Sequence, residues 1–448
     1  MSLSAKKLRP SALQNLSTVS LHKIAQVVGQ IVAVLTIPRL LGADDHGRFA
    51  FVLAYSFLGQ ILGDFGTLEV MSRFVPTMSQ ADIGRLYSRT LFFKIGVGLV
   101  CGVLAAALGL ILAPWLRLEW AGLIGLGVLS HIVAWVPFHL MLGLNQVGKW
   151  MVEQSWRQWA LVILLILLYP WLELGGTMVA WALMEVIFCI LGLWWARAYW
   201  QPAELSLDWA YLKPYIHFGF GFFLANLVGA ALYRSSPVLV EALTGQSAQA
   251  GYINLAIGLY MMPYLMLTQV AFSLVPTLSE FYTTGQIDKM QAWLHNFVRY
   301  SWLFGWLGVI GVWLTVDWGV LLIFGPDYAL AAAPLKWISL GIPLAGPLWA
   351  GNALATVTGR GPLKFWATLA ALLVFLAAAL WLIPGYLAAG AAIALSVSIL
   401  VNVGVLIVSL QPEFTLERPV LLTGGITAIV AIAIIEFYEL SVVYWGIF

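Results

Sequence analysis

Charged residues are scarce in this chain. Of its 448 residues only 9% are Asp, Glu, Lys or Arg, whereas 62% are hydrophobic, and the mean hydropathy is +0.92. No soluble globular protein of this length has such a composition. The net charge of +2 gives no basic surface for nucleic acid, so we expect no nucleic-acid partner.

Cysteine pairs, metal motifs and long loops are also lacking. Cys101 and Cys189 both fall in apolar segments and indicate no disulfide framework. The six histidines lack metal-binding spacings, so we expect no metal and no cofactor. The single Gly-Lys pair, Gly148-Lys149, precedes Trp150, which excludes a phosphate-binding loop. With no room for a catalytic domain outside the membrane, we expect no enzyme activity.

Long apolar runs, in contrast, recur along the whole sequence. A helix needs about 20 mostly apolar residues to cross a bilayer. The predicted spans are 18–40, 48–71, 88–113, 119–141, 155–173, 176–198, 215–243, 249–278, 292–316, 330–357, 363–384 and 387–410. A further run at 418–436 predicts a thirteenth span. We therefore predict an all-α polytopic membrane protein with 12–13 transmembrane helices.

The distribution of Lys and Arg predicts the orientation. Inner loops carry an excess of basic residues in membrane proteins. With the N-terminus inside, 17 of the 22 basic residues fall in inner loops or near inner span ends, and Lys94 and Arg157 are counted among them. The five that remain outside are Arg39, Arg48, Arg117, Arg234 and Lys336.

The two halves of the chain share local landmarks. Gly47 and Gly251 each open a span beside an aromatic residue, 204 residues apart, and Gly148 and Gly359 follow spans at an offset of 211. Six spans per half is an even number, so both halves enter from the same side. Such parallel repeats are related by a pseudo-two-fold axis along the membrane normal.

This repeat predicts the domain organisation. We expect an N-terminal six-helix lobe at 1–200, an inner connector at 201–214 and a C-terminal six-helix lobe at 215–410, followed by an extra hydrophobic segment at 411–448. Two lobes around a cleft are typical of alternating-access transporters.

The stretch "IPRLLGADDHGRFAFVLAYSFLGQILGDFGTLEVMSRFV" resembles the polysaccharide-biosynthesis flippases, which are O-antigen or lipid-linked oligosaccharide translocases of the multidrug/oligosaccharidyl-lipid/polysaccharide exporter superfamily. The segments "LIFGPDYALAAAPLKWISLG" and "ATVTGRGPLKFW" in the second half agree with it. One position departs from the pattern. Many relatives carry an acidic residue before the Arg in span 7, and this chain has Tyr233 before Arg234.

The resemblance implies a transporter that flips an undecaprenyl-pyrophosphate-linked oligosaccharide or polysaccharide precursor from the inner to the outer leaflet. It implies a bacterial cytoplasmic (inner) membrane, polysaccharide polymerase machinery as partner and a monomer. Two rivals are a cation-coupled multidrug exporter of the same superfamily, and a membrane polysaccharide polymerase or glycosyltransferase. A lipid II flippase is a nearer variant.

Arg234 lies inside an apolar span, which is costly in lipid. A pyrophosphate that crosses a low-dielectric interior needs a cation, and the planar fork of Arg suits phosphate. The residues predicted to bind substrate are Lys23, Gln26, Gln30, Arg39, Asn226, Tyr233, Arg234 and Asn254. Two structural alternatives stay open: hydrogen bonds between helices of one lobe, and pairing of Arg234 with Glu241.

The energy source is predicted from carboxylates inside spans. Asp64 is the leading candidate for a proton or sodium site, with Glu241 as a second, because buried carboxylates have tunable proton affinity. Membrane potential acting on an anionic substrate is an equal alternative. Asp64 and Glu69 could instead pair structurally with Arg73.

Overall fold

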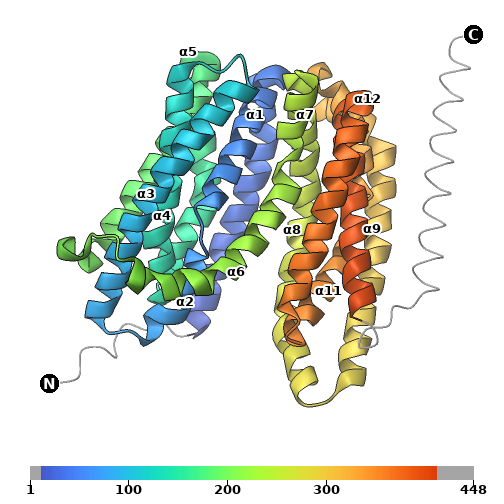
Figure 1. Cartoon of the computed structure of the whole chain (residues 1–448). Helices are drawn as coiled ribbons and strands as arrows, with labels where there is room; N and C mark the ends of the chain where they lie inside the picture. Colours follow the sequence, from blue (N-terminus) through green and yellow to red (C-terminus); the bar gives the residue numbers. More distant parts are fainter. Residues whose placement is uncertain (1–11, 411–448) are drawn as a thin grey trace, which may run out of the picture. The chain divides into compact units, whose positions relative to one another are not determined.

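The computed structural model describes residues 12–410, and the side chains of all of these except 12–18, 265–277 and 361. Every regular element in this range is a helix, as Figure 1 shows, so the predicted all-α class is confirmed. Seven of the described helices are long and apolar enough to cross a membrane. The predicted thirteenth span at 418–436 lies outside the described residues.

Three of the helices are too long to be single spans. They are α1 (Ala12–Leu62), α5 (Val147–Ala196) and α12 (Gly361–Ser409). At about 1.5 Å per residue each would extend about 75 Å, more than twice the apolar core of a bilayer. A residue with positive φ interrupts each of them, namely Gly42, Glu173 and Leu387. In α5 the chain folds back at this residue. The close approach of its two arms shows this, since a Cβ added to Gly176 would lie 2.7 Å from the backbone oxygen of Leu168.

The remaining helices follow the predicted order. They are α2 (Thr67–Phe74), α3 (Gln80–Leu112), α4 (Leu118–Gly143), α6 (Trp209–Arg234), α7 (Ser236–Thr244), α8 (Ser247–Thr283), α9 (Ile287–Phe324), α10 (Ala332–Ser339) and α11 (Ala345–Val357). Short 3-10 turns occupy Val75–Thr77, Arg197–Tyr199, Pro202–Glu204 and Pro326–Ala331. With both arms of each interrupted helix counted, the twelve predicted spans are all represented.

Three predicted spans are broken where the sequence pattern suggested continuous helices. Span 48–71 ends at Leu62 and resumes as α2, span 215–243 breaks at Ser235 between α6 and α7, and span 330–357 breaks between α10 and α11. Hydropathy does not register such breaks, because the residues at them are as apolar or as small as their neighbours. Breaks at membrane depth are tolerated where protein or a water-filled cavity satisfies the backbone.

Contacts between residues divide the chain into two compact units. The N-terminal unit comprises Met1–Leu41 and Arg48–Ala230, and the C-terminal unit comprises Gly42–Gly47 and Ala231–Phe448. Most of α6 therefore packs with the N-terminal unit, beyond the predicted connector at 201–214. The predicted lobe boundaries stay a prediction. They divide the chain by repeated sequence landmarks, whereas the two units are divided by contacts between residues.

Contacts of the connector explain why the N-terminal unit extends beyond residue 214, as far as Ala230. Glu204 accepts ion pairs from Arg85 (Nε to Oε1, 3.1 Å) and from Arg89 (NH2 to Oε2, 2.7 Å), and Asp208 pairs with Arg89 at 2.7 Å. The Arg89 guanidinium also lies 4.6 Å from the centre of the Tyr211 ring. These contacts tie the start of α6 to α3 in the N-terminal unit.

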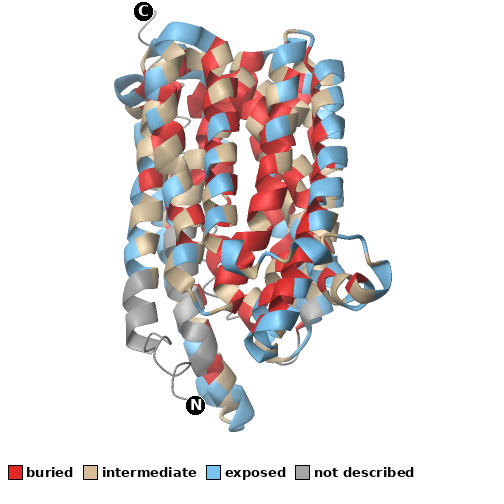
Figure 2. Cartoon of the chain, turned by 90° about the vertical axis from the view of Figure 1, so that its left-hand side faces the viewer, coloured by how far each residue is buried: buried red, intermediate tan, exposed pale blue. Residues whose placement is uncertain are grey.

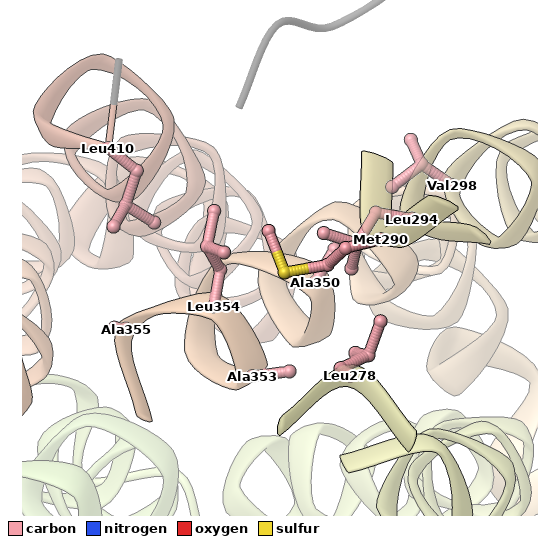
Figure 3. Packing of buried hydrophobic residues seen from close by; sticks show 9 residues of the cluster. All are labelled: Leu278, Met290, Leu294, Val298, Ala350, Ala353, Leu354, Ala355 and Leu410. Atoms are coloured by element: carbon pink, nitrogen blue, oxygen red, sulfur yellow. The ribbon is translucent and has the colours of Figure 1, made fainter. Parts of the chain in front are cut away.

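Within each unit, buried positions lie on the helix sides that face other helices (Figure 2). Lipid supplies little hydrophobic driving force between helices, so close packing of small residues is important. In the N-terminal unit, α3 and α4 approach at Gly102 and Gly125, where a Cβ added to Gly102 would lie 2.6 Å from the Gly125 oxygen. In the C-terminal unit, Ala350 and Ala353 of α11 sit among larger side chains from α8 and α9 (Figure 3).

Candidate functional site

The break between α1 and α2 positions Asp64. Phe65 and Gly66 both have positive φ, and a Cβ added to Gly66 would lie 2.3 Å from the backbone oxygen of Gly219 on α6. The Thr67 hydroxyl donates to the Asp64 backbone oxygen at 2.6 Å. Because α6 packs directly on this turn, the Asp64 side chain is fixed in a buried position within the N-terminal unit.

Lys94 binds the backbone at this break. It lies near the middle of α3 with only 1% of its surface exposed. Its ammonium donates to the backbone oxygens of Gly63 and Asp64, the second at 2.5 Å. These carbonyls belong to a helix C-terminal end, where the macrodipole favours a cation. The Asp64 carboxylate in turn accepts a 3.4 Å hydrogen bond from the Asn226 amide.

A second buried cluster, which we call the Glu185 network, joins α1, α4 and both arms of α5 in the same unit. Glu185 of α5 is 1% exposed. Its Oε1 accepts hydrogen bonds from Arg157 and, at 3.3 Å, from the Gln60 amide. Its Oε2 lies 2.9 Å from Nδ1 of His131. Arg157 also donates to Glu153 at 3.0 Å, so both carboxylates share one guanidinium.

The charges in the Glu185 network do not cancel when His131 is neutral. Arg157 supplies one positive charge, while Glu153 and Glu185 supply two negative charges. Burying a net charge in a medium of low dielectric constant is costly. One added proton, on His131 or on a carboxylate, makes the sum zero. The network therefore carries one net negative charge unless one of its members binds a proton.

Aromatic rings separate this network from Lys94. Trp135 packs edge-on against His131, with ring centres 4.6 Å apart, and stacks on His139 at 6.1 Å. The Lys94 ammonium lies 5.9 Å from the centre of the Trp135 ring. The two buried groups of polar residues are thus neighbours, with indole and imidazole rings between them.

Arg234 lies at a helix break in the C-terminal unit. It is the last residue of α6, and α7 begins two residues later at Ser236 with Pro237 in its first turn. The Ser235 hydroxyl donates to the Ala231 oxygen at 2.5 Å, which closes the end of α6. Arg234 is exposed in spite of its apolar surroundings. The positive N-terminal end of α7 lies next to it in the chain, an arrangement that favours anions.

The other residues predicted in span 7 contact different partners. Tyr233 lies within hydrogen-bonding reach of Tyr264 on α8. Glu241 is on α7 rather than on the helix of Arg234, is buried, and accepts a 2.9 Å hydrogen bond from Ser247. Asn226 and Arg234 on α6 therefore do not share one continuous helix with Glu241, because α6 ends at Arg234 and α7 begins at Ser236.

Asn254 and the landmark glycines hold one turn together. The Asn254 amide lies 3.2 Å from Nε2 of His46. A Cβ added to Gly47 would lie 1.6 Å from the Ser247 backbone oxygen, and one added to Gly251 would lie 2.7 Å from that of Ala43. The two glycines found by sequence repeat are therefore required by close backbone packing.

The predicted residues of span 1 are not brought into one cluster. Lys23 donates to Gln26 one turn away, at 3.0 Å. Gln30 is half-buried, and Arg39 is exposed near the end of the first arm of α1. Their role in substrate binding stays a prediction.

Sequence reasoning missed the Glu185 network. Lys94 and Arg157 were counted near inner span ends, whereas both lie well inside their helices. Glu185 lies in the middle of predicted span 176–198, and Glu153 and Arg157 have the i, i+4 spacing of a helical ion pair. A carboxylate in mid-span with no partner on its own helix was the signal that could have found the site.

The comparison with family models now decides the family. The model for "Polysaccharide biosynthesis protein" matches residues 12–282. The chain belongs to this family. A search among curated protein sequences gives no match. The family assignment agrees with the resemblance carried by the motifs of the first half.

Solved structures share the fold of this family member. One is a lipid II flippase, MurJ, in an inward closed conformation, with a TM-score of 0.75, 12% identity and coverage of 96% of this chain and 93% of that one. An inward-facing multidrug resistance MATE transporter of the MOP superfamily has a TM-score of 0.66, with 14% identity and coverage of 92% and 95%.

A MOP superfamily transporter from Pyrococcus furiosus, described as having a binding pocket of reverse polarity, has a TM-score of 0.54, with 12% identity and coverage of 93% of each chain. All three structures belong to membrane transport proteins. The chain therefore shares the fold of these structures, and the predicted all-α membrane-protein class is confirmed.

Proposed function

We propose that this protein flips a lipid-linked oligosaccharide or polysaccharide precursor, carried on undecaprenyl pyrophosphate, from the inner to the outer leaflet by alternating access. Membership of the polysaccharide biosynthesis family supports a glycan cargo. The shared fold with a lipid II flippase supports a lipid carrier. The membrane is the bacterial cytoplasmic membrane, with the N-terminus inside and polysaccharide polymerase machinery as the downstream partner of a monomer.

The exposed Arg234 at the broken span 7 carries this proposal. Discontinuous helices in transporters direct half-helix N-termini at anionic substrate groups. Here the N-terminus of α7 and the guanidinium of Arg234 occur together at such a break. A guanidinium fork binds two phosphate oxygens at once and offsets the loss of their hydration. Arg234 is thus suited to bind the pyrophosphate, whereas a cationic drug would be repelled by it.

The Glu185 network is the candidate for energy coupling. It gains neutrality with one proton, as its charges indicate. Asp64 was the leading candidate from sequence, but the Lys94 ammonium lies beside it and donates to its backbone oxygen. We therefore assign proton coupling to Glu185 and His131. Protonation of the Glu185 carboxylate would weaken its hold on Arg157 and so alter the packing of α4 against α5.

A deletion strain tests the proposed function. Cells that lack the protein should accumulate lipid-linked sugar on the inner leaflet, and wild-type protein should restore its export. An Arg234→Ala protein at equal expression should not restore export. Export restored equally by both proteins would remove the support that Arg234 gives. Sensitivity to cationic drugs, with normal glycan export, would favour the multidrug exporter instead.

A further inference from the structure

A groove in the C-terminal unit has no role in the chemistry described so far. It has a volume of about 680 Å³ and lies between α8, α9 and the link from α10 to α11. Its lining on α9, among the described residues, is Trp293, Asn296, Phe297, Tyr300, Ser301, Phe304 and Gly305. These residues recur every three or four positions and so form one face of the helix. Over twelve residues the groove extends about 18 Å along the helix axis.

The floor of the groove is deep because small residues pack against backbone there. A Cβ added to Gly305 would lie 2.5 Å from Cα of Pro343, so this position cannot carry a side chain. Ser301 is buried against Gly346, and it leaves no room for a side chain at that glycine. Its hydroxyl donates to the Val298 oxygen at 3.0 Å. The first turns of α9 are held in place because Met290, Leu294 and Val298 pack on α8 and α11 (Figure 3). The groove is therefore built by the fold.

The lining selects an elongated apolar occupant. Aromatic rings form the rim, with Trp293, Tyr300 and Phe304 exposed by 49%, 57% and 67%. α9 is one of the helices apolar enough to cross a membrane, so the groove runs along the direction of lipid tails. Its length is more than half of the apolar thickness of about 30 Å. An extended hydrocarbon chain fits this shape better than a compact molecule.

One end of the groove is polar. The Tyr260 hydroxyl is buried and has no hydrogen-bond partner within the described part of the chain. Tyr264 stacks beside it, with ring centres 6.1 Å apart, and lies within reach of the Tyr233 hydroxyl. Tyr233 is the neighbour of Arg234. The polar end of the groove at Tyr264 therefore lies next to the residue that precedes Arg234, and the opposite end lies at Trp293.

We propose that this groove holds the polyprenyl tail of the lipid-linked substrate while Arg234 holds its pyrophosphate. The inference rests on the proposed function, and it adds a binding site for the carrier lipid. An ordinary phospholipid would match the apolar wall, but its single phosphodiester offers less negative charge and fewer oxygens to Arg234 than a pyrophosphate does. The carrier matches both ends.

Two probes with the same head and different tails test the assignment. Undecaprenyl pyrophosphate and dimethylallyl pyrophosphate are bound to the full-length protein in nanodiscs. Asn296→Trp fills the groove, and Leu303→Trp on the same helix, outside the lining and 53% exposed, is the control. Asn296→Trp should weaken binding of the long-tailed probe about tenfold or more, because each methylene excluded from an apolar site weakens binding several-fold. Binding of the short probe should not change.

The outcomes separate the groove from the proposed function. If wild-type protein binds neither probe, the proposed function fails and the groove assignment fails with it. If both probes bind and Asn296→Trp leaves the long-tailed affinity unchanged, only the groove assignment is overturned. Leu303→Trp with the same effect as Asn296→Trp would also overturn it.

A second measurement does not depend on the filled variant. Benzoylphenylalanine in place of Tyr300 should cross-link to undecaprenyl pyrophosphate at several times the yield obtained from the Leu303 position. Excess phosphatidylglycerol should not reduce the yield. Equal yields from the two positions, or loss of the cross-link to phosphatidylglycerol, would show that bulk lipid covers this face.

Discussion

The two units differ in the kind of polar group that they bury. The N-terminal unit buries Lys94, Glu153 and Glu185 together with a largely buried Arg157. The described part of the C-terminal unit buries hydroxyls and amides, apart from His46 and Glu241, and contains the apolar groove. Two halves with matching spans have therefore acquired different chemistry. We propose that the first unit binds the coupling proton and that the second binds the lipid.

The largest effect on stability should come from removing the shared cation of the Glu185 network in the N-terminal unit. Arg157→Ala leaves Glu153 and Glu185 buried without their shared cation, which costs about 3–5 kcal/mol. We expect loss of folded protein or a sharply lowered Tm in detergent. Arg117→Ala removes an ion pair to Glu119 at 3.7 Å between two exposed side chains and should leave the Tm unchanged. Equal effects would show that the network is not the electrostatic core of its unit.

The glycine contact behind Asp64 should matter next. Gly66→Ala introduces a Cβ 2.3 Å from the Gly219 oxygen at φ 66°, a strain of about 1–3 kcal/mol. The Tm should fall, and α6 should be displaced from the Asp64 turn. Gly229→Ala lies on α6 with nothing within 4 Å of the added Cβ and should stabilise by about 0.5–1 kcal/mol. A Gly66→Ala protein as stable as Gly229→Ala would contradict the described packing.

Neutralising Glu185 should change coupling more than stability. Glu185→Gln keeps a hydrogen-bonding side chain of the same shape but cannot carry the exchangeable proton. In proteoliposomes we expect a pH gradient to accelerate wild-type transport about tenfold, equivalent to about 1.4 kcal/mol, and to leave the variant unaffected. Glu204→Gln, in the connector outside the network, should respond as wild type does. A variant that still responds to the gradient would move coupling elsewhere.

The smallest effect compares single hydroxyls. Tyr260→Phe removes a buried hydroxyl that has no partner among described residues, so its stability cost should be about zero. Ser155→Ala in the N-terminal unit removes a bond to the Met151 oxygen at 2.7 Å and a contact with His22 at 3.2 Å. We expect a cost of about 1 kcal/mol for it. Thermal unfolding of both variants in one detergent provides the comparison, and the reverse order would contradict it.

Sequence was sufficient for the twelve spans because long apolar runs and Gly-aromatic turns are local signals. Gly47 and Gly251 were identified correctly as landmarks, and the structure gives their reason in close backbone contact. The breaks at Asp64 and Ser235 were not predicted. They depend on what packs against the turn, such as Gly219 opposite Gly66, and a contact between distant residues leaves no local signature.

The Glu185 network shows a second limit. Its members come from α1, α4 and the two arms of α5, and only Glu153 and Arg157 are close in sequence. Counting basic residues by side assigned Arg157 to an inner span end, although its partners are buried carboxylates. A count of basic residues predicts which side of the membrane a loop faces. It does not reveal a basic residue that pairs with buried carboxylates, as Arg157 does. Orientation itself, with the N-terminus inside, stays a prediction that reporter fusions to successive loops would test.

Reconstituted transport by Arg234 variants tests the central claim most directly. Fluorescent undecaprenyl-pyrophosphate-linked sugar is placed in proteoliposomes that contain wild-type, Arg234→Lys or Arg234→Ala protein, and exposure to the opposite leaflet is measured with an impermeant quencher. The account predicts rapid flipping by wild type, partial activity for Arg234→Lys and a loss of at least about a hundredfold for Arg234→Ala, equivalent to about 2.7 kcal/mol. Flipping by a well-folded Arg234→Ala protein at the wild-type rate would contradict it.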